Sequence, residues 1–392
     1  MHATDLVLAV TTVDRHVSNI YAKLGVSSRA AAYAYEPGSS RHSCGELPRC
    51  SSPRMGGFPD AGPAGQPLAS AQTHAPEEAP MSSRPQTRTQ QPHSAEIRQV
   101  YERLLAGASV RSHQIEVAGG RVHLLEHGAG PPVVLLHGTR NPAGFLLPLL
   151  NELHGVRAIA PDRPGVGLSD PIDLPRDRYR ESAVAWLDRL LDTLELDTTA
   201  LLGHSGGGVW ALWYALAHPD RVERLVLLGV PTLPKTRCPL PIRMVGTPGL
   251  GQLLSRLVPP SPKSVLRLAS AVGEKGTLAS YPDLVDLLVA AGRDSVSDRA
   301  AMAEFRALIS PFALLSPSGF RRRGRVRPDE LRQLAKPTLL LWGERDPVAS
   351  IPVARAVAEL IPHARLEVLP TGHGPWLGQP MRTAASAADF VR

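Results

Sequence analysis

Cysteine is scarce in this chain of 392 residues, which has only Cys44, Cys50 and Cys238. Three cysteines provide no disulfide framework, and no paired Cys or His spacing indicates a zinc site. Long apolar runs are also missing: none reaches the about eighteen residues of a membrane span, and the stretch from Leu6 to Val10 is too short for a secretory signal. We therefore expect a cytoplasmic protein that does not enter a membrane.

Acidic residues are outnumbered by basic ones, and the formal net charge is +7. One cluster of arginines contributes much of the excess: Arg321, Arg322, Arg323, Arg325 and Arg327. No aromatic side chains interleave these arginines, as they do on nucleic-acid binding platforms. We interpret the cluster as a solvated connector in preference to an anion-attracting patch.

Hydrophobic periodicity is absent from residues 37–93, where proline, glycine and serine dominate. Such a segment cannot bury enough apolar surface to offset the entropy lost on ordering, so we predict a disordered linker. It separates residues 1–36 from a globular body that begins near Ser94. The body opens with helical spacing of apolar residues at Ile97, Val100, Tyr101 and Leu104.

The fragment before this linker has its own helical pattern. Thr12 is placed to cap a helix whose apolar stripe is Val13, Val17 and Ile20. Residues 12–30 resemble the recognition helix and last helix of LuxR-type helix-turn-helix regulators, a likeness that extends over about residues 3–35. The resemblance implies that DNA would face Arg15, His16, Asn19 and Lys23.

A LuxR-type domain needs additional helix upstream to complete its core, and here the chain begins inside that unit. A helix this short is marginal in water without such packing. We therefore do not expect stable DNA binding. We hypothesise a non-functional remnant, or a reading frame whose true start is Met81, in preference to a working DNA-binding module.

Residues 201–207, Leu-Leu-Gly-His-Ser-Gly-Gly, are the most informative segment. In a GxSxG elbow the serine occupies a strained strand-to-helix turn, where side chains at Gly203 or Gly207 would collide with neighbouring backbone. Ser205 is thereby exposed beside the N–H groups of a helix start, which favour a developing oxyanion. The required helix follows, with apolar residues at Val209, Leu212, Trp213 and Leu216.

Eight segments of the body, including the one before the elbow, have the sequence pattern of strands, and helical patterns separate most of them. They are 113–117, 121–126, 133–136, 158–160, 200–202, 225–228, 338–341 and 366–369. Near-continuous apolar strands joined through helices indicate a parallel sheet covered on both faces, and the first two strands read as an antiparallel hairpin.

From about residue 95 to its end the chain resembles an α/β-hydrolase, because four motifs agree in order. They are His137-Gly138 of an oxyanion loop, the DxxGxGxS loop at Asp162 to Asp170, the elbow at Ser205, and the pair of segments Gly343 to Asp346 and Gly372 to Gly374. The resemblance implies an α/β fold with a mostly parallel eight-stranded sheet. It also implies a core of residues 94–230 and 337–392, and a helical cap at 231–336.

The resemblance also implies a catalytic triad of Ser205, Asp346 and His373. The imidazole would take the serine proton, and the carboxylate would orient the imidazole and stabilise its charged form. Glu344 is an alternative acid, but the family pattern and the following Pro347 favour Asp346.

Other residues receive supporting roles. The backbone N–H groups of Thr139 and Gly206 would form the oxyanion hole. We expect His137, His204 and Asp162 to be structural, with Arg163 able to approach the pocket. Trp210 and Trp376 are candidate substrate-binding residues, although core packing explains Trp210 equally well.

The sequence therefore predicts a serine hydrolase that cleaves an ester or similar acyl bond of a small molecule, without metal or organic cofactor. A nucleophilic serine argues against epoxide hydrolases and haloalkane dehalogenases, which use aspartate. A lactonase, C–C hydrolase, aminopeptidase or cofactor-free haloperoxidase fits the same fold. A different class of function is a DNA-binding regulator that uses the hydrolase body as a ligand sensor.

Overall fold

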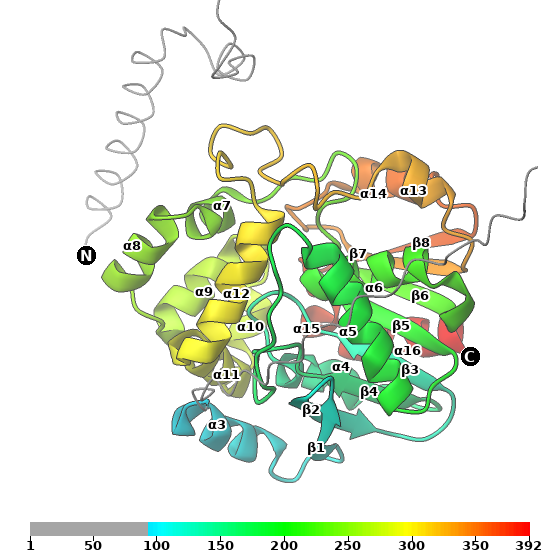
Figure 1. The fold of residues 1–392 in the computed structure, drawn as a ribbon, viewed down its shortest axis with the longest axis horizontal. Coiled ribbons are helices and arrows are strands. Elements are labelled where there is room, and N and C mark those ends of the chain that lie inside the picture. Colours follow the sequence, from blue (N-terminus) through cyan, green and yellow to red (C-terminus); the bar gives the residue numbers. More distant parts are fainter. Residues whose placement is uncertain (1–92) are drawn as a thin grey trace, which may run out of the picture. The chain divides into compact units, whose positions relative to one another are not determined.

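The structure is a computed structural model that describes residues 93–392 (Figure 1). The predicted helix-turn-helix fragment, residues 37–92 of the predicted linker and the proposed start at Met81 lie outside these residues; His93, the last residue of that linker, is ordered and buried. Within the described part of the chain, no helix is long and apolar enough to cross a membrane.

One sheet organises the fold, and each of its eight strands contains a strand segment predicted from the sequence. The strands are β1 (Arg111–Val117), β2 (Gly120–His127), β3 (Pro132–Leu136), β4 (Arg157–Pro161), β5 (Thr199–His204), β6 (Val222–Leu228), β7 (Thr338–Gly343) and β8 (Ala364–Leu369). Their order in the sheet is β1-β2-β4-β3-β5-β6-β7-β8. β2 pairs antiparallel with β1 and β4, and all other pairs are parallel. The predicted fold class is confirmed.

Alternate residues of each strand face opposite sides of the sheet and join two separate apolar clusters. In β3, Val133 and Leu135 belong to one cluster, and Val134 and Leu136 belong to the other. All four side chains are almost fully buried. Full burial of one such side chain contributes about 1.5–3 kcal/mol, so both faces need a helical cover.

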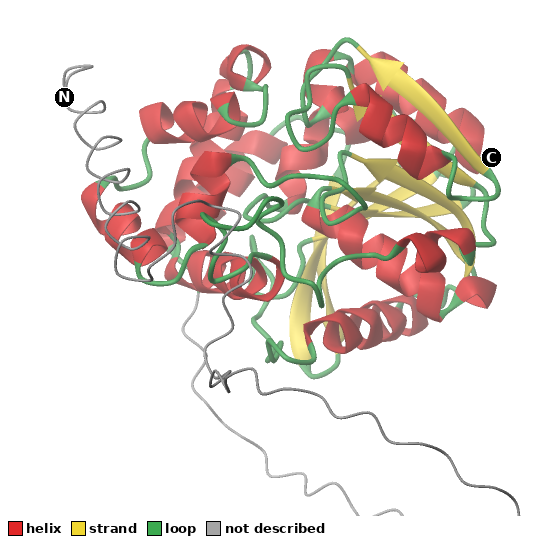
Figure 2. Ribbon diagram, turned by 90° about the horizontal axis from the view of Figure 1, so that it is seen from above, coloured by secondary structure: helices red, strands yellow, loops and turns green. Residues whose placement is uncertain are grey.

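Helices supply that cover on both sides, as Figure 2 shows from above. On one face α5 (Tyr179–Thr193), α6 (Gly206–Ala217) and α14 (Ile351–Ala358) carry buried apolar residues, and η2 (Pro219–Arg221) follows α6. The opposite face is covered by α3 (Ala95–Leu105), η1 (Ala143–Leu146), α4 (Leu147–Leu150), α15 (Pro375–Gly378) and α16 (Pro380–Val391). The first of these, α3, is the helix predicted near Ser94.

A helical cap follows the sixth strand, as predicted, and all of its helices except the last lie to one side of the sheet in Figure 1. The helices between β6 and β7 are α7 (Leu240–Gly246), α8 (Leu250–Leu257), α9 (Pro262–Ser270), α10 (Lys275–Ala279), α11 (Pro282–Arg293), α12 (Ser295–Leu308) and α13 (Pro328–Arg332). The leucine spacing in α8 is helical, but Leu253 and Leu257 are exposed. They lie on the outer side of the cap because α8 packs mainly against α7.

A buried carboxylate joins the cap to the start of α3. Asp294 caps α12 by accepting a hydrogen bond from Ser297 N at 2.8 Å, and it also accepts one from Ser94 N at 2.8 Å. The His93 imidazole lies 2.9 Å from the same carboxylate and 2.8 Å from the Ser169 carbonyl oxygen. The start of α3, the loop after β4 and the cap are therefore fixed to one another through His93 and Asp294.

We predict that Gly207→Ala disrupts the turn between β5 and α6. A Cβ at Gly207 would lie 2.2 Å from the Leu136 carbonyl oxygen and 2.4 Å from that of His137, and backbone atoms of a central strand cannot move away. We expect a loss of at least about 3 kcal/mol in the free energy of unfolding, measured by urea denaturation.

Gly276→Ala is the matched control, because a Cβ at this position in α10 meets no atom within 4 Å. Alanine is the better helix former, so this variant should be as stable as the parent or up to about 1 kcal/mol more stable. Equal stability of Gly207→Ala and the parent would contradict the close approach described here.

Candidate active site

The turn after β5 exposes a serine in a strained conformation. Ser205 has φ 49° and ψ −120°, between the last residue of β5 and the first residue of α6. A Cβ at Gly203 would lie 2.5 Å from Gly208 Cα, so the strand and the helix approach each other too closely for a side chain. The Ser205 side chain is partly exposed, whereas the neighbouring positions are buried. This geometry matches the predicted nucleophile elbow.

Loops after two neighbouring strands bring an imidazole and a carboxylate to this serine. His373 follows β8, and its Nε2 lies 3.0 Å from Ser205 Oγ. Its Nδ1 lies 2.9 Å from Oδ2 of Asp346, which follows β7. The other carboxylate oxygen accepts a hydrogen bond from Val348 N at 2.8 Å, which fixes the orientation of Asp346. The structure thus brings together the three predicted triad side chains, while Glu344 is exposed.

The charges around His373 favour its protonated form. Burial alone would lower the pKa of His373, but the Asp346 carboxylate, with a smaller effect of Glu274, raises it above the ordinary value. Glu274, just before α10 of the cap, accepts a hydrogen bond from Gly374 N at 2.8 Å. The backbone N–H of His373 donates a hydrogen bond to the Val272 carbonyl oxygen at 3.1 Å. The cap therefore fixes the loop that carries the imidazole, a contact that no sequence motif indicated.

Two backbone N–H groups lie together beside Ser205. A Cβ built on Gly206 would be 2.4 Å from Thr139 Oγ1 and 3.2 Å from Thr139 N, so the two residues are adjacent. Across residues 93–392, no protein acceptor receives a hydrogen bond from either N–H. Gly206 opens α6, where N–H groups lack intrahelical partners. Within this part of the chain both N–H groups are therefore unpaired, and their role as an oxyanion hole stays a prediction.

His137 braces the loop that carries Thr139. Its Nε2 accepts a hydrogen bond from Arg163 N at 2.8 Å, and its Nδ1 lies 2.9 Å from the Gly138 carbonyl oxygen. Burial and the nearby Arg163 charge lower the pKa of His137 to about 3, so the ring is neutral. A neutral ring with the proton on Nδ1 satisfies both contacts.

His204 lies beneath the site rather than in it. Its ring packs edge-on against Trp376, with 4.5 Å between ring centroids, and against His373, with 5.0 Å. Burial, together with the His373 charge, places the pKa of His204 well below its ordinary value. The His204 ring is thus neutral and packs against the His373 imidazole.

The two tryptophans predicted to bind substrate are both buried. Trp210 packs among the aromatic rings of Tyr179 and Trp186 on one side of the sheet. Trp376 donates from Nε1 to the Phe145 carbonyl oxygen at 3.2 Å. The environment of Trp210 is that of a residue packed in the core. A substrate-binding role for Trp210 or Trp376 stays a prediction.

Asp162 organises the loop after β4. This buried carboxylate accepts hydrogen bonds from Tyr101 Oη at 2.8 Å, Ala143 N at 2.6 Å and Leu168 N at 2.9 Å, and lies 2.8 Å from His123 Nδ1. Burial would raise the pKa of Asp162, but His123 and the other hydrogen-bond donors lower it, so the group is ionised. The structural role expected for Asp162 agrees with these contacts.

The next residue, Arg163, extends toward the cap. Its guanidinium forms two hydrogen bonds to the Glu304 carboxylate of α12, at 2.9 Å and 3.0 Å, and both side chains are buried. Burial would lower the pKa of Arg163, but Glu304 raises it. Sequence reasoning missed Glu304. The available signal was an acidic residue on the buried stripe of α12, which also includes Ser297, Ala301 and Leu308.

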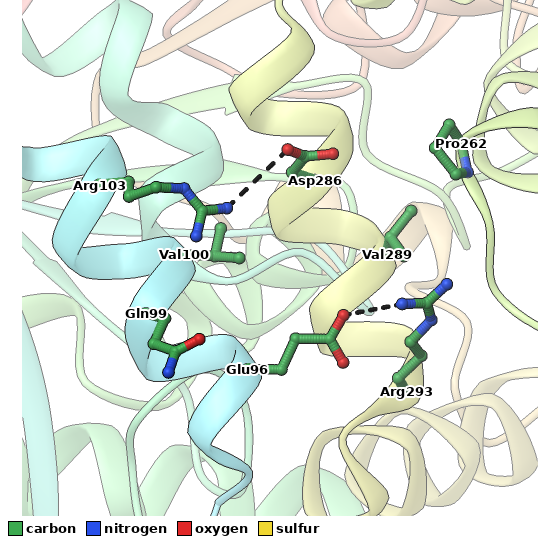
Figure 3. A pocket seen from close by; sticks show the side chains of 8 residues that line it. All are labelled: Glu96, Gln99, Val100, Arg103, Pro262, Asp286, Val289 and Arg293. Atoms are coloured by element: carbon green, nitrogen blue, oxygen red, sulfur yellow. Dashed lines mark hydrogen bonds and ion pairs between the residues drawn. The ribbon is translucent and has the colours of Figure 1, made fainter.

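A hollow lies between α3 and α11 (Figure 3). It is lined by Glu96, Gln99, Val100, Arg103, Pro262, Asp286, Val289 and Arg293. Its charges pair across the two helices: Arg293 lies 2.8 Å from Glu96, and Arg103 lies 3.9 Å from Asp286. These ion pairs link α3 to the cap. Within residues 93–392, no group of His, Cys, Asp and Glu is arranged to hold a metal ion.

A family model described as the alpha/beta hydrolase fold matches residues 131–377. The chain belongs to the α/β-hydrolase family. A 2-hydroxymuconate semialdehyde hydrolase of a Pseudomonas species is 29% identical over 295 residues, which are 71% of this chain and 93% of that protein. A protein of the same name from Pseudomonas putida is 30% identical with the same coverage.

Solved structures of other α/β-hydrolases share the fold. A meta-cleavage product hydrolase from Pseudomonas fluorescens has a TM-score of 0.55 and 23% identity, and the match covers 71% of this chain and 96% of that one. A carboxylesterase from Bacillus subtilis has a TM-score of 0.57 and 21% identity, with 75% and 96% coverage. The family assignment and these relatives identify the chain as a hydrolase.

We predict that the reactivity of Ser205 is lost as the pH falls through a value above 6.5, the ordinary pKa of histidine. His373 accepts the serine proton only when it is neutral, and its raised pKa keeps it protonated above that value. The measurement is the rate of covalent labelling by a fluorophosphonate between pH 5 and 9.

Two variants sharpen this measurement. Glu274→Gln should lower the pH at which the labelling rate is half of its maximum, because Glu274 contributes to the raised pKa of His373. His363→Ala, at an exposed position, should leave it unchanged. A parent midpoint below 6.5 would show that His373 does not act as described.

Proposed function

We propose that this α/β-hydrolase cleaves an ester or related acyl bond of a small, uncharged substrate through an acyl-serine intermediate. The observation that carries the proposal is the continuous set of contacts from Ser205 Oγ to His373 Nε2 at 3.0 Å and from His373 Nδ1 to Asp346 at 2.9 Å. This is the spacing that proton transfer from a nucleophile to a general base requires.

In the first half of the reaction, Ser205 Oγ attacks the acyl carbon and its proton passes to His373 Nε2. The carbonyl oxygen becomes an oxyanion that accepts hydrogen bonds from Thr139 N and Gly206 N, each worth about 3 kcal/mol in the transition state. The imidazolium, stabilised by Asp346, then donates its proton to the leaving alkoxide, which departs as an alcohol. The acyl group remains on Ser205.

In the second half, water attacks the acyl carbon while His373 takes one of its protons. The resulting tetrahedral intermediate uses the same two N–H donors. It breaks down when the serine oxygen leaves and recovers the proton from His373, and a carboxylic acid is released. The cap covers this chemistry and limits the access of bulk water.

Hydrolysis of a C–C bond is the second candidate, and the curated relatives favour it. Their names include 2-hydroxymuconate semialdehyde hydrolase and 2-hydroxy-6-oxo-6-phenylhexa-2,4-dienoate hydrolase. The substrates in these names are carboxylates. The arginine beside the oxyanion hole of this chain is already paired with Glu304, and for this reason we favour the uncharged ester.

The test is a panel of p-nitrophenyl esters of increasing acyl length. We expect turnover by the parent and a loss of at least about a thousandfold in kcat/KM for Ser205→Ala, because the nucleophile is removed. Ser270→Ala, at the exposed end of α9, is the control and should retain full activity. Turnover that survives in Ser205→Ala would place the chemistry elsewhere.

The second candidate is tested in parallel with 2-hydroxy-6-oxo-6-phenylhexa-2,4-dienoate, by the loss of its dienoate absorbance. We expect kcat/KM to be lower for this compound than for the best ester. The reverse ranking would replace the ester proposal with C–C hydrolysis.

A further inference from the structure

The acidic residues of α12 reach across from the cap to the two arginines nearest the oxyanion hole. Glu304 pairs with Arg163 through both carboxylate oxygens, at 2.9 Å and 3.0 Å. One turn and a half earlier in the helix, Asp298 lies 3.0 Å from Arg140, the residue that follows Thr139. Both arginines are therefore neutralised from the cap side.

The Glu304 carboxylate also borders the oxyanion hole itself. A Cβ built on Gly206 would be 2.7 Å from Glu304 Oε1 and 3.2 Å from Thr139 N. The carboxylate oxygen and the Thr139 N–H are thus both close to the same point beside Gly206. A bare carboxylate at this place would repel an oxyanion, and Arg163 cancels that charge by binding both of its oxygens.

The Arg163–Glu304 pair is rigidly supported. The guanidinium lies over the Trp210 ring, 4.8 Å from its centroid. The Arg163 backbone N–H is bound by His137, which braces the oxyanion loop. Both side chains of the pair are less than 5% exposed, so water screens their charges only weakly.

We propose that Glu304 is a specificity residue that excludes acyl groups bearing a carboxylate and admits uncharged ones. Glu304 forms a bidentate ion pair with the Arg163 guanidinium. Without Glu304, this guanidinium would be available to bind a substrate carboxylate in the same bidentate way. The inference rests on the proposed ester hydrolysis at Ser205 and adds the substrate class. A substrate carboxylate that enters this site loses its hydration and finds no unpaired guanidinium at Arg163 to replace it.

The test compares two p-nitrophenyl esters of equal size, the glutarate half-ester and the 5-oxohexanoate ester, in which a methyl ketone replaces the carboxylate. We expect the parent to prefer the uncharged ester by roughly a hundredfold in kcat/KM, after subtraction of uncatalysed release. In Glu304→Gln, the ratio of the charged to the uncharged ester should rise by roughly 10- to 100-fold, because Arg163 becomes available.

Two further variants separate the role of the charge from a general disturbance of the cap. Arg163→Gln combined with Glu304→Gln should return the ratio to that of the parent, because the guanidinium is gone. Asp286→Asn changes an acid of the cap that pairs with Arg103 in the hollow between α3 and α11, and should leave the ratio unchanged. An unchanged ratio in a folded Glu304→Gln variant that still hydrolyses the uncharged ester would overturn the proposal.

Calorimetric titration with butyrate and butyramide tests the role of Glu304 by binding alone, without ester hydrolysis. We expect Glu304→Gln to bind butyrate at least tenfold more tightly than the parent does, with equal binding of butyramide. If no ester is turned over but this difference appears, the proposed reaction fails and the assignment of Glu304 stands.

Equal butyrate affinity in the parent and the variant would overturn the assignment, whatever the kinetics. Circular dichroism and the thermal midpoint establish that each variant is folded. Should Glu304→Gln fail to fold, Glu304→Met is measured with the same expected and contradicting outcomes.

Discussion

The close approach of the loop after β3 to the first turn of α6 is the constraint on which the site depends. It leaves no room for a side chain at Gly207, whose Cβ would lie 2.2 Å from the Leu136 carbonyl oxygen. The same contact holds Ser205 at φ 49° and places Thr139 beside Gly206. Backbone packing at one edge of the sheet therefore positions Ser205 and the N–H groups of Thr139 and Gly206. His373 and Asp346 then arrive on loops from the adjacent strands β8 and β7.

The cap contributes more than a cover. Val272 and Glu274 bind the backbone on either side of the catalytic imidazole, Glu304 neutralises Arg163, and Asp294 binds the start of α3. Three segments of the cap thus form hydrogen bonds with three segments of the core. A cap attached in this way can set both the basicity of His373 and the charge of the substrate pocket. This gives a physical reason for different chemistries on one α/β-hydrolase core.

Local patterns were enough to predict the sheet and the meeting of Ser205, Asp346 and His373. Each strand combined a short apolar run with a turn, and these three residues stood at strand ends; their catalytic roles stay a prediction. The contacts made by the cap were not predictable, because Glu274 lies 100 residues from Gly374 along the chain and Glu304 lies 141 residues from Arg163. These residues meet only after the cap has folded over the core. The role of Glu304 was easier to predict than that of Glu274, because Glu304 is a charged residue on the buried stripe of a helix. For Trp210 the sequence signal was ambiguous. Its proximity to Ser205 along the chain did not show whether the side chain lines a substrate pocket or packs in the core.

The most direct test of the account is mass spectrometry of the protein quenched in acid milliseconds after mixing with a p-nitrophenyl ester. The account predicts an added acyl mass on the peptide that contains Ser205, and its absence in His373→Ala. Rapid ester turnover with no acyl adduct, or an adduct on another residue, would contradict the account.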